Sequence, residues 1–166
     1  MIRIAVSLLS GLLVLAACAL DKEEEVRAQI APWVKLGETY FFESSSSCTA
    51  AVFYIESPRI SSLVSRARSM ATGMNMLSAG KPVYFDVRGK TPNALTEEIM
   101  SRDLPQGISV LNSGLAGAHC MTELVKGVYY QAIMNPTSQL IFVPDGDAMI
   151  VLDRQAGALI YVRGSG

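Results

Sequence analysis

The stretch AMIVL, residues 148–152, is apolar at every position and lies between two similar runs, LIFV at 140–143 and ALIYV at 158–162. Asp145-Gly146 separates the first two runs and is a dipeptide typical of tight hairpin turns. Residues 153–157 separate the second and third runs, so the three runs predict a β-meander. An antiparallel sheet with one wet face alternates apolar and polar residues. We therefore expect both faces of this sheet to be buried, under helices, by curling of the sheet, or against a partner protein.

Three further runs rich in β-forming residues precede the meander. GETYFFE at 37–43 and CTAAVFYI at 48–55 flank the polar segment 44–47, and this arrangement predicts a hairpin. PVYFDV at 82–87 predicts one middle strand.

Two short helices are predicted from their end signals. Residues 23–34 predict a helix with Asp21 as its N-cap, and Pro32 should bend or end it. Thr91-Pro92 combines an N-cap residue with a proline at the first helical position, which predicts a helix to about residue 101.

Two longer helices are predicted from apolar spacing. Ser57-Pro58 opens a segment in which apolar residues recur every three or four positions to Leu77, so we expect a helix over 57–80. Similar spacing starts at Ile108 after a break at 103–107, and we expect its firm part to cover 114–134. Interior glycines weaken this second helix.

These elements predict an α+β fold, with a mainly antiparallel sheet of about six strands and two or three packed helices. The sheet comprises the N-terminal hairpin, one middle strand and the three-stranded C-terminal meander. We expect residues 37–166 to form a single domain, preceded by a signal peptide at 1–17 and a lipidated N-terminus with a short tether or helix at 18–36.

The N-terminus has the organisation of an export signal. Arg3 precedes a nearly uninterrupted apolar run at 4–15, and the acidic Asp21 follows. A membrane-spanning helix needs about 20 apolar residues, whereas a signal-peptide core needs only about 7–15. This run has the length of a signal-peptide core, so we expect export and removal of the leader.

The cleavage region resembles that of bacterial lipoproteins. Leu15-Ala16-Ala17-Cys18 matches their lipobox: a leucine, two small residues and a cysteine. The resemblance implies a diacylglyceryl group on the Cys18 thiol, cleavage before Cys18, and an acyl chain such as palmitate on the new N-terminus. It covers only this segment, and an ordinary secreted protein cut near Ala17 is the alternative. Ala19 stands where an aspartate would favour the inner membrane, so we expect a periplasm-facing protein on the outer membrane. The tether is short, so its body should lie near the bilayer.

Composition limits the partners. The chain has 166 residues, of which 50% are hydrophobic and 17% are charged, which is enough for a sizeable core. Its net charge is −1, and loss of Arg3 with the leader makes it −2. Because nucleic acids and anionic lipids select basic patches, we expect neither to be the main partner.

Two cysteines remain after lipidation of Cys18. In an oxidising compartment Cys48 and Cys120 most simply form a disulfide, which would close a loop of about 70 residues. A reactive or metal-bound thiol is the alternative.

The segment around Cys120 is the only dense group of chemistry-bearing residues. His119 and Glu123 would share a helical face at i and i+4, and Cys120 would lie close to Glu123. Adjacent residues on a helix point about 100° apart, so the His119 side chain would be poorly placed to accept a proton from the Cys120 thiol. We take the three as weak catalytic candidates, and no hydrolase or phosphate-binding motif occurs in the sequence.

Methionines supply a weak metal hypothesis. Met70 and Met74 would share a helical face, and thioethers suit Cu(I), but methionine is also ordinary core filler. The segment 145–147 lacks the full calcium-loop ligand series, so we expect only a turn there.

Three functions remain, in this order. The first is a non-catalytic, lipid-anchored envelope protein that acts as an accessory or assembly subunit for another envelope protein. The second is a copper-handling lipoprotein using Met70, Met74, His119 or Met121. The third is a small thiol enzyme or hydrolase around His119, Cys120 and Glu123. We expect no bound cofactor.

Overall fold

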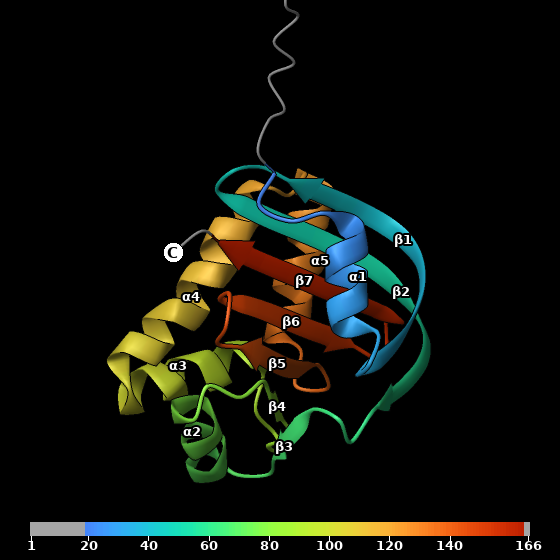
Figure 1. The fold of residues 1–166 in the computed structure, drawn as a ribbon. Coiled ribbons are helices and arrows are strands. Elements are labelled where there is room, and N and C mark those ends of the chain that lie inside the picture. The colour runs from blue at the N-terminus through green and yellow to red at the C-terminus, as the bar shows by residue number, and fades with distance from the viewer. Residues whose placement is uncertain (1–18, 165–166) are drawn as a thin grey trace, which may run out of the picture.

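The computed structural model describes residues 19–164 and contains, within that range, five helices and one seven-stranded sheet (Figure 1). The strands are β1 (Val34–Ser44), β2 (Cys48–Ile60), β3 (Ser65–Ala67), β4 (Val83–Phe85), β5 (Gln139–Val143), β6 (Ala148–Asp153) and β7 (Ala158–Gly164). The helices are α1 (Glu23–Ile30), α2 (Met70–Ser78), α3 (Pro92–Arg102), α4 (Leu104–His119) and α5 (Glu123–Met134).

The fold is α+β, as the sequence predicts. The strand order is β1-β2-β7-β6-β5-β4-β3, and every neighbouring pair is antiparallel except β3 and β4. The N-terminal hairpin and the C-terminal meander are both present. The sheet has seven strands where about six were expected, and five helices are present where two or three were expected to pack.

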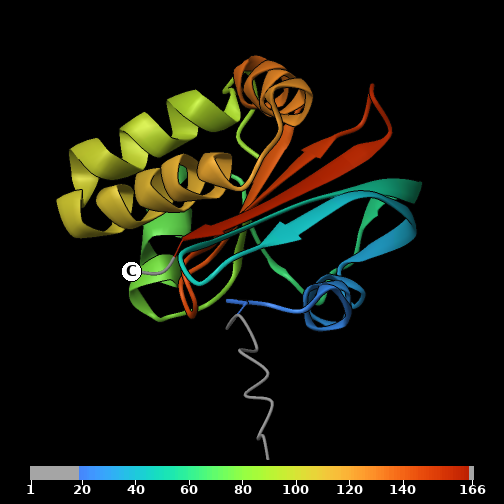
Figure 2. The same ribbon diagram turned by 90° about the horizontal axis from the view of Figure 1, so that it is seen from above.

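The sheet is buried on both faces by the chain itself. Alternate residues of the meander belong to two separate hydrophobic clusters, Val151 and Ile160 to one, Ile150 and Tyr161 to the other. Helices α3, α4 and α5 cover the first face, and α1 with the curled β1–β2 hairpin covers the second (Figure 2). Within residues 19–164 the apolar strands are thus explained by helices and by curling, which cover both faces of the sheet.

The helix predicted over 57–80 is wrong in its first half. Strand β2 continues to Ile60, which pairs with Val34 of β1, and α2 begins only at Met70 after the cap residue Ser69. Pro58 lies where the β1–β2 register shifts, and there the missing N–H of proline costs little. Pairing across the hairpin therefore outweighs the local helix-start signals.

The helix predicted over 114–134 is two helices. Helix α4 begins earlier, at Leu104, because the Asp103 side chain accepts a hydrogen bond from the Gln106 N–H, 3.2 Å away, and caps it. It ends at His119, and α5 starts after Thr122, whose hydroxyl accepts from the Val125 N–H at 3.3 Å. The sulfurs of Cys48 and Cys120 lie at disulfide-bonding distance, and this link fixes the corner between the two helices.

Candidate interaction surface

Helix α4 exposes a row of large apolar side chains. Leu104, Ile108, Leu111 and Leu115 are 59%, 42%, 38% and 54% exposed, and their 4-3-4 spacing places them on one face of the helix. We call these four residues the α4 stripe. The whole helix, LPQGISVLNSGLAGAH, contains no Asp, Glu, Lys or Arg. The stripe is therefore apolar, and the helix that carries it has no acidic residue and no lysine or arginine.

The face of α4 that packs on the protein is built largely from small residues, which explains why the leucines point outward. A Cβ atom on Gly107 would lie 2.1 Å from the Met100 Cα of α3, and one on Gly117 would lie 2.5 Å from the Val162 Cβ of β7. Normal carbon contacts are about 3.5–4.0 Å, so these glycines are required for the close approach. Helix α4 thus turns its smallest residues to the protein and its largest to solvent, the reverse of an ordinary surface helix.

An apolar groove runs beside the stripe. A hollow of about 300 Å³ lies between α3, α4 and α5, with Leu111 and Leu115 on its α4 side. On its α5 side lie Tyr130 and Met134, which are 49% and 59% exposed. Buried Tyr129 also lines the groove, and burial raises the pKa of its hydroxyl, whose hydrogen bond goes only to the weak acceptor Met149 Sδ at 3.8 Å.

A second hollow lies on the other side of α4, and Ile108 and Leu115 of the stripe also line it. It has a volume of about 480 Å³ and includes Ser109, Ser113, His119 and Asp147. Ser109 donates to the Asp147 carboxylate, and the Ser113 hydroxyl bonds the Asp147 carbonyl at 2.6 Å. These serines secure the β5–β6 turn to α4. Among the described residues no hydrogen bond joins His119 to either serine, so the structure shows no nucleophile–base pair here.

The candidate catalytic residues do not form one site. His119 is the last residue of α4 and is exposed, whereas Glu123 is the first residue of α5 and pairs with Lys126 at 2.7 Å. Because the chain turns between them, the predicted i, i+4 helical face for His119 and Glu123 is wrong. The Cys120 sulfur lies 2.00 Å from that of Cys48, so Cys120 offers no free thiolate in this structure.

The methionine candidates are part of the core. Met70 and Met121 are both 6% exposed, and Met74 packs against the same hydrophobic cluster. In the described part of the chain no group of three or more His, Cys, Asp or Glu side chains could hold a metal ion. Met70, Met74 and Met121 therefore occupy positions that ordinary core packing explains.

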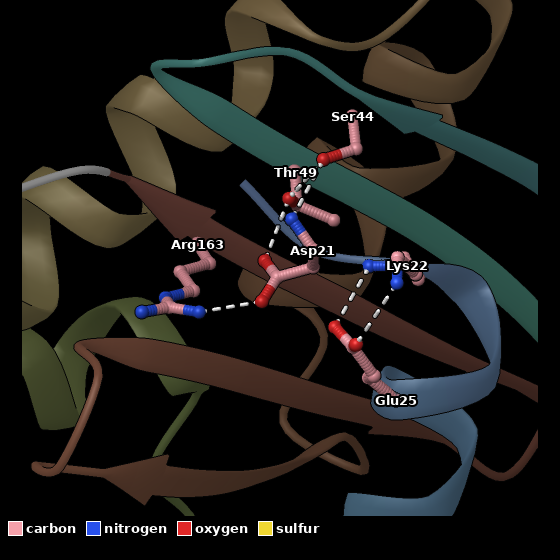
Figure 3. Close-up of polar contacts among 6 residues, drawn as sticks. All are labelled: Asp21, Lys22, Glu25, Ser44, Thr49 and Arg163. Carbon is pink, nitrogen blue, oxygen red and sulfur yellow. Dashed lines mark hydrogen bonds and ion pairs between the residues drawn. The ribbon is translucent and has the colours of Figure 1, made fainter. Parts of the chain in front are cut away.

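The start of the described chain is bound to the tip of the β1–β2 hairpin (Figure 3). The Leu20 N–H donates to the Ser45 carbonyl at 2.7 Å, and the Asp21 N–H donates to Ser44 Oγ at 3.1 Å. The Asp21 carboxylate accepts from Thr49 Oγ1 at 2.7 Å and from the Arg163 guanidinium. Asp21 is only 8% exposed.

The prediction that Asp21 caps the first helix is wrong. Lys22 occupies the N-cap position of α1, and its N–H donates to Glu25 at 3.3 Å. Asp21 instead joins the N-terminal segment to β2 and to β7, at a sequence separation of 142 residues from Arg163. The only sequence signal was Arg163 itself, a single charge directly after the apolar run of β7.

The proposed lipid-attachment residue Cys18 lies outside the described residues, one position before Ala19. Within residues 19–164, none of the helices combines the length and apolar character needed to span a bilayer. Comparisons of the chain with protein-family models, curated proteins and solved structures find no match.

Proposed function

We propose that this chain is a lipid-anchored, non-catalytic envelope protein that binds an uncharged, apolar helix of another envelope protein through the α4 stripe and its adjoining groove. The main support for this proposal is the reversed orientation of α4, which packs its glycines against the protein and exposes its leucines to solvent. The fold of this chain requires only the glycine face of α4, which packs against α3 and β7. Exposure of the leucine face serves a contact outside the chain.

The size of the surface supports a protein partner. The α4 stripe with Tyr130 and Met134 exposes roughly 600 Å² of side-chain area, the upper end of the largest patch on typical monomers. A standard interface buries about 800 Å² on each partner, so this patch can form most of an interface core.

The shape and charge of the surface favour a helix as the occupant. An apolar groove flanked by a helical ridge accepts an amphipathic helix that places side chains at i, i+3 or i+4. Because the part of α4 that carries the stripe, residues 104–115, has no charged residue, a charged partner face would lose its hydration without gaining an ion pair there. Tyr130 and Met134 supply an aromatic contact and an adaptable thioether at the groove.

Lipid attachment completes the proposal. The lipobox at 15–18 supports acylation of Cys18, and several acyl chains on one residue are enough for stable membrane anchoring. Ala19 favours the outer membrane. The intact mass of protein extracted from bacterial membranes tests this step, because an uncleaved leader or an unmodified Cys18 contradicts it.

Site-specific photocrosslinking tests the partner surface. A photoreactive residue replaces Leu111 or Leu115 in cells, and Leu63, a 75% exposed leucine in the β2–β3 loop, is the matched control. We expect both α4 positions to give one product containing the same protein, identified by mass spectrometry, and position 63 to give none. The purified partner should bind the wild type but not Ile108→Glu.

Two results would overturn the proposed partner surface. A product with twice the mass of the chain would show that a second copy fills the stripe. Absence of any product from both α4 positions in cells that contain the protein in its membrane would show that the stripe has no protein occupant.

A further inference from the structure

The described chain begins very close to the proposed lipid. Cys18 is two residues before Leu20, and the Leu20 N–H is bonded to the Ser45 carbonyl at the hairpin tip. Two residues span at most about 7 Å. The acyl chains on Cys18 must therefore enter the bilayer within about 10 Å of the hairpin tip.

The attachment point cannot slide away from this end while the Asp21 contacts persist. The buried carboxylate is held from β2 by Thr49 and from β7 by Arg163, and the backbone is held by Ser44 and Ser45. Removing the partner of a buried charge costs several kcal/mol, so the segment is fixed to the body rather than acting as a flexible leash.

One end of the molecule surrounds this point. We define the hairpin end as residues 44–47, residues 119–124 and Gly164. A shallow hollow lined by residues of the hairpin tip and of 119–122 shows that these two segments are adjacent. The tip of the β1–β2 hairpin, the C-terminal end of α4 and the N-terminal end of α5 lie together at the top of Figure 1.

The exposed chemistry of the hairpin end suits a lipid surface of low charge. Its exposed residues are Ser46, Ser47, His119, Thr122, Glu123 and Leu124. Leu124 is 67% exposed, and the carboxylate of this set, Glu123, is paired with Lys126. Exposed Glu43 borders the hollow and adds a second carboxylate beside the hairpin tip. Hydroxyl groups can bond lipid headgroups, and a leucine beside them can enter the acyl boundary, as apolar residues of interfacial helices do.

We propose that the hairpin end rests on the bilayer, with Leu124 inserted at the headgroup–acyl boundary. This inference rests on lipid attachment at Cys18. Helix α4 then starts at most about 22 Å from the membrane at Leu104 and approaches it at His119, so the α4 stripe meets a partner segment close to the membrane.

Tryptophan quenching tests the orientation in the full lipidated protein. The lone Trp33 lies at the opposite end of β2, where its carbonyl accepts from the Ser61 N–H, and Trp33→Phe removes it. Leu124→Trp and the matched control Leu63→Trp are then compared in phosphatidylethanolamine–phosphatidylglycerol vesicles containing brominated lipid. We expect at least about fivefold stronger quenching at position 124, within the depth that interfacial residues reach.

A longer tether supplies the second variant without touching the fold. Insertion of about eight glycine and serine residues after Ala19 extends the reach by about 28 Å. We expect quenching at position 124 to fall towards that at position 63, while flotation with the vesicles stays unchanged.

The outcomes separate this inference from the proposed function. Flotation with equal quenching at positions 124 and 63, or with quenching that the insertion does not lower, overturns the orientation and leaves lipid anchoring intact. Failure to float overturns lipid anchoring and the orientation together. Neither result alters the crosslinking test of the α4 stripe.

Discussion

Replacing Gly107 by alanine tests whether the glycine face of α4 is what holds the stripe outward. The new Cβ would lie 2.1 Å from the Met100 Cα and 2.5 Å from its backbone nitrogen. Both are backbone atoms of α3, which cannot rotate away as the end of a flexible side chain can. The two helices must therefore separate by more than 1 Å or so to restore normal contact.

The expected loss of stability follows from two opposing terms. Overpacking of a close contact costs about 1–3 kcal/mol, and the backbone obstacle places Gly107→Ala near the top of that range. Against this loss, alanine has a higher helix propensity than glycine, which stabilises the helix by up to about 1 kcal/mol. We expect a net loss of about 2 kcal/mol in the free energy of unfolding.

Gly127→Ala is the matched control. It makes the same chemical change in helix α5, where no atom lies within 4 Å of the new Cβ. We expect this variant to gain about 0.5–1 kcal/mol from helix propensity and reduced freedom of the unfolded chain. The two variants should thus differ by about 3 kcal/mol, or roughly 6–10 °C in Tm.

Thermal and urea unfolding, followed by circular dichroism with the disulfide intact, measures both variants. A Gly107→Ala protein as stable as the wild type, or stabilised like Gly127→Ala, would refute the close α3–α4 packing. The reversed orientation of α4 would then lose its physical explanation.

Three further predictions concern the interior. Replacing Cys48 and Cys120 together by alanine should lower the free energy of unfolding by roughly 4 kcal/mol, because the link closes a loop of about 70 residues; urea unfolding against the wild type measures this. Thr49→Val should lower the free energy of unfolding by about 1–3 kcal/mol in the same assay, since buried Thr49 donates to the Asp21 carboxylate. An unchanged urea midpoint for this variant would contradict the Asp21 contacts. Burial raises the pKa of Tyr129 above its ordinary 10.0. The unfolded state then releases this proton near pH 10 while the folded state keeps it, so stability should fall as pH rises above 10, by up to about 1.4 kcal/mol per pH unit. Tyr129→Phe should flatten that decline in urea unfolding from about pH 8 to about pH 11, and an identical slope would show that the hydroxyl is not buried.

Much of the sheet could be predicted because its signals are local. The unbroken apolar runs of β5, β6 and β7 require burial on both faces, and turn residues separate them. Helix α3 was also predictable, since the Thr91 side chain caps it by accepting from the Ala94 N–H at 3.0 Å. In these segments local preference and tertiary packing favour the same structure.

The errors occur where distant contacts override local preference. The segment beginning at Ser57-Pro58 has a good helix start, but pairing of Ile60 with Val34 keeps it extended. The turn at Cys120 interrupts a helical pattern because its sulfur is linked to Cys48, 72 residues earlier. Neither of these long-range contacts can be recognised from the residues that are near in the sequence.

The proposed interaction surface could be predicted only in part from the sequence. The spacing of Ile108, Leu111 and Leu115 predicts a helix, but periodicity alone does not say which face is buried. The overlooked signal was a second row on the same helix, Gly107 and Gly114, whose seven-residue spacing places two glycines on one face. Glycines aligned in this way indicate close helix packing, and they leave the leucines for solvent.

The strand order has a consequence for how the protein is made. Strand β7 contains the last described residues, yet it lies in the interior of the sheet between β2 and β6 and contributes to both hydrophobic clusters. Synthesis proceeds from the N-terminus, so the middle of the sheet stays empty until the end of the chain is available. Until then the earlier strands lack the partner that joins β2 to β6, so the sheet can close only after β7 has been made. In a chain that is exported as proposed, this order would leave the sheet open while the chain passes through a translocation channel.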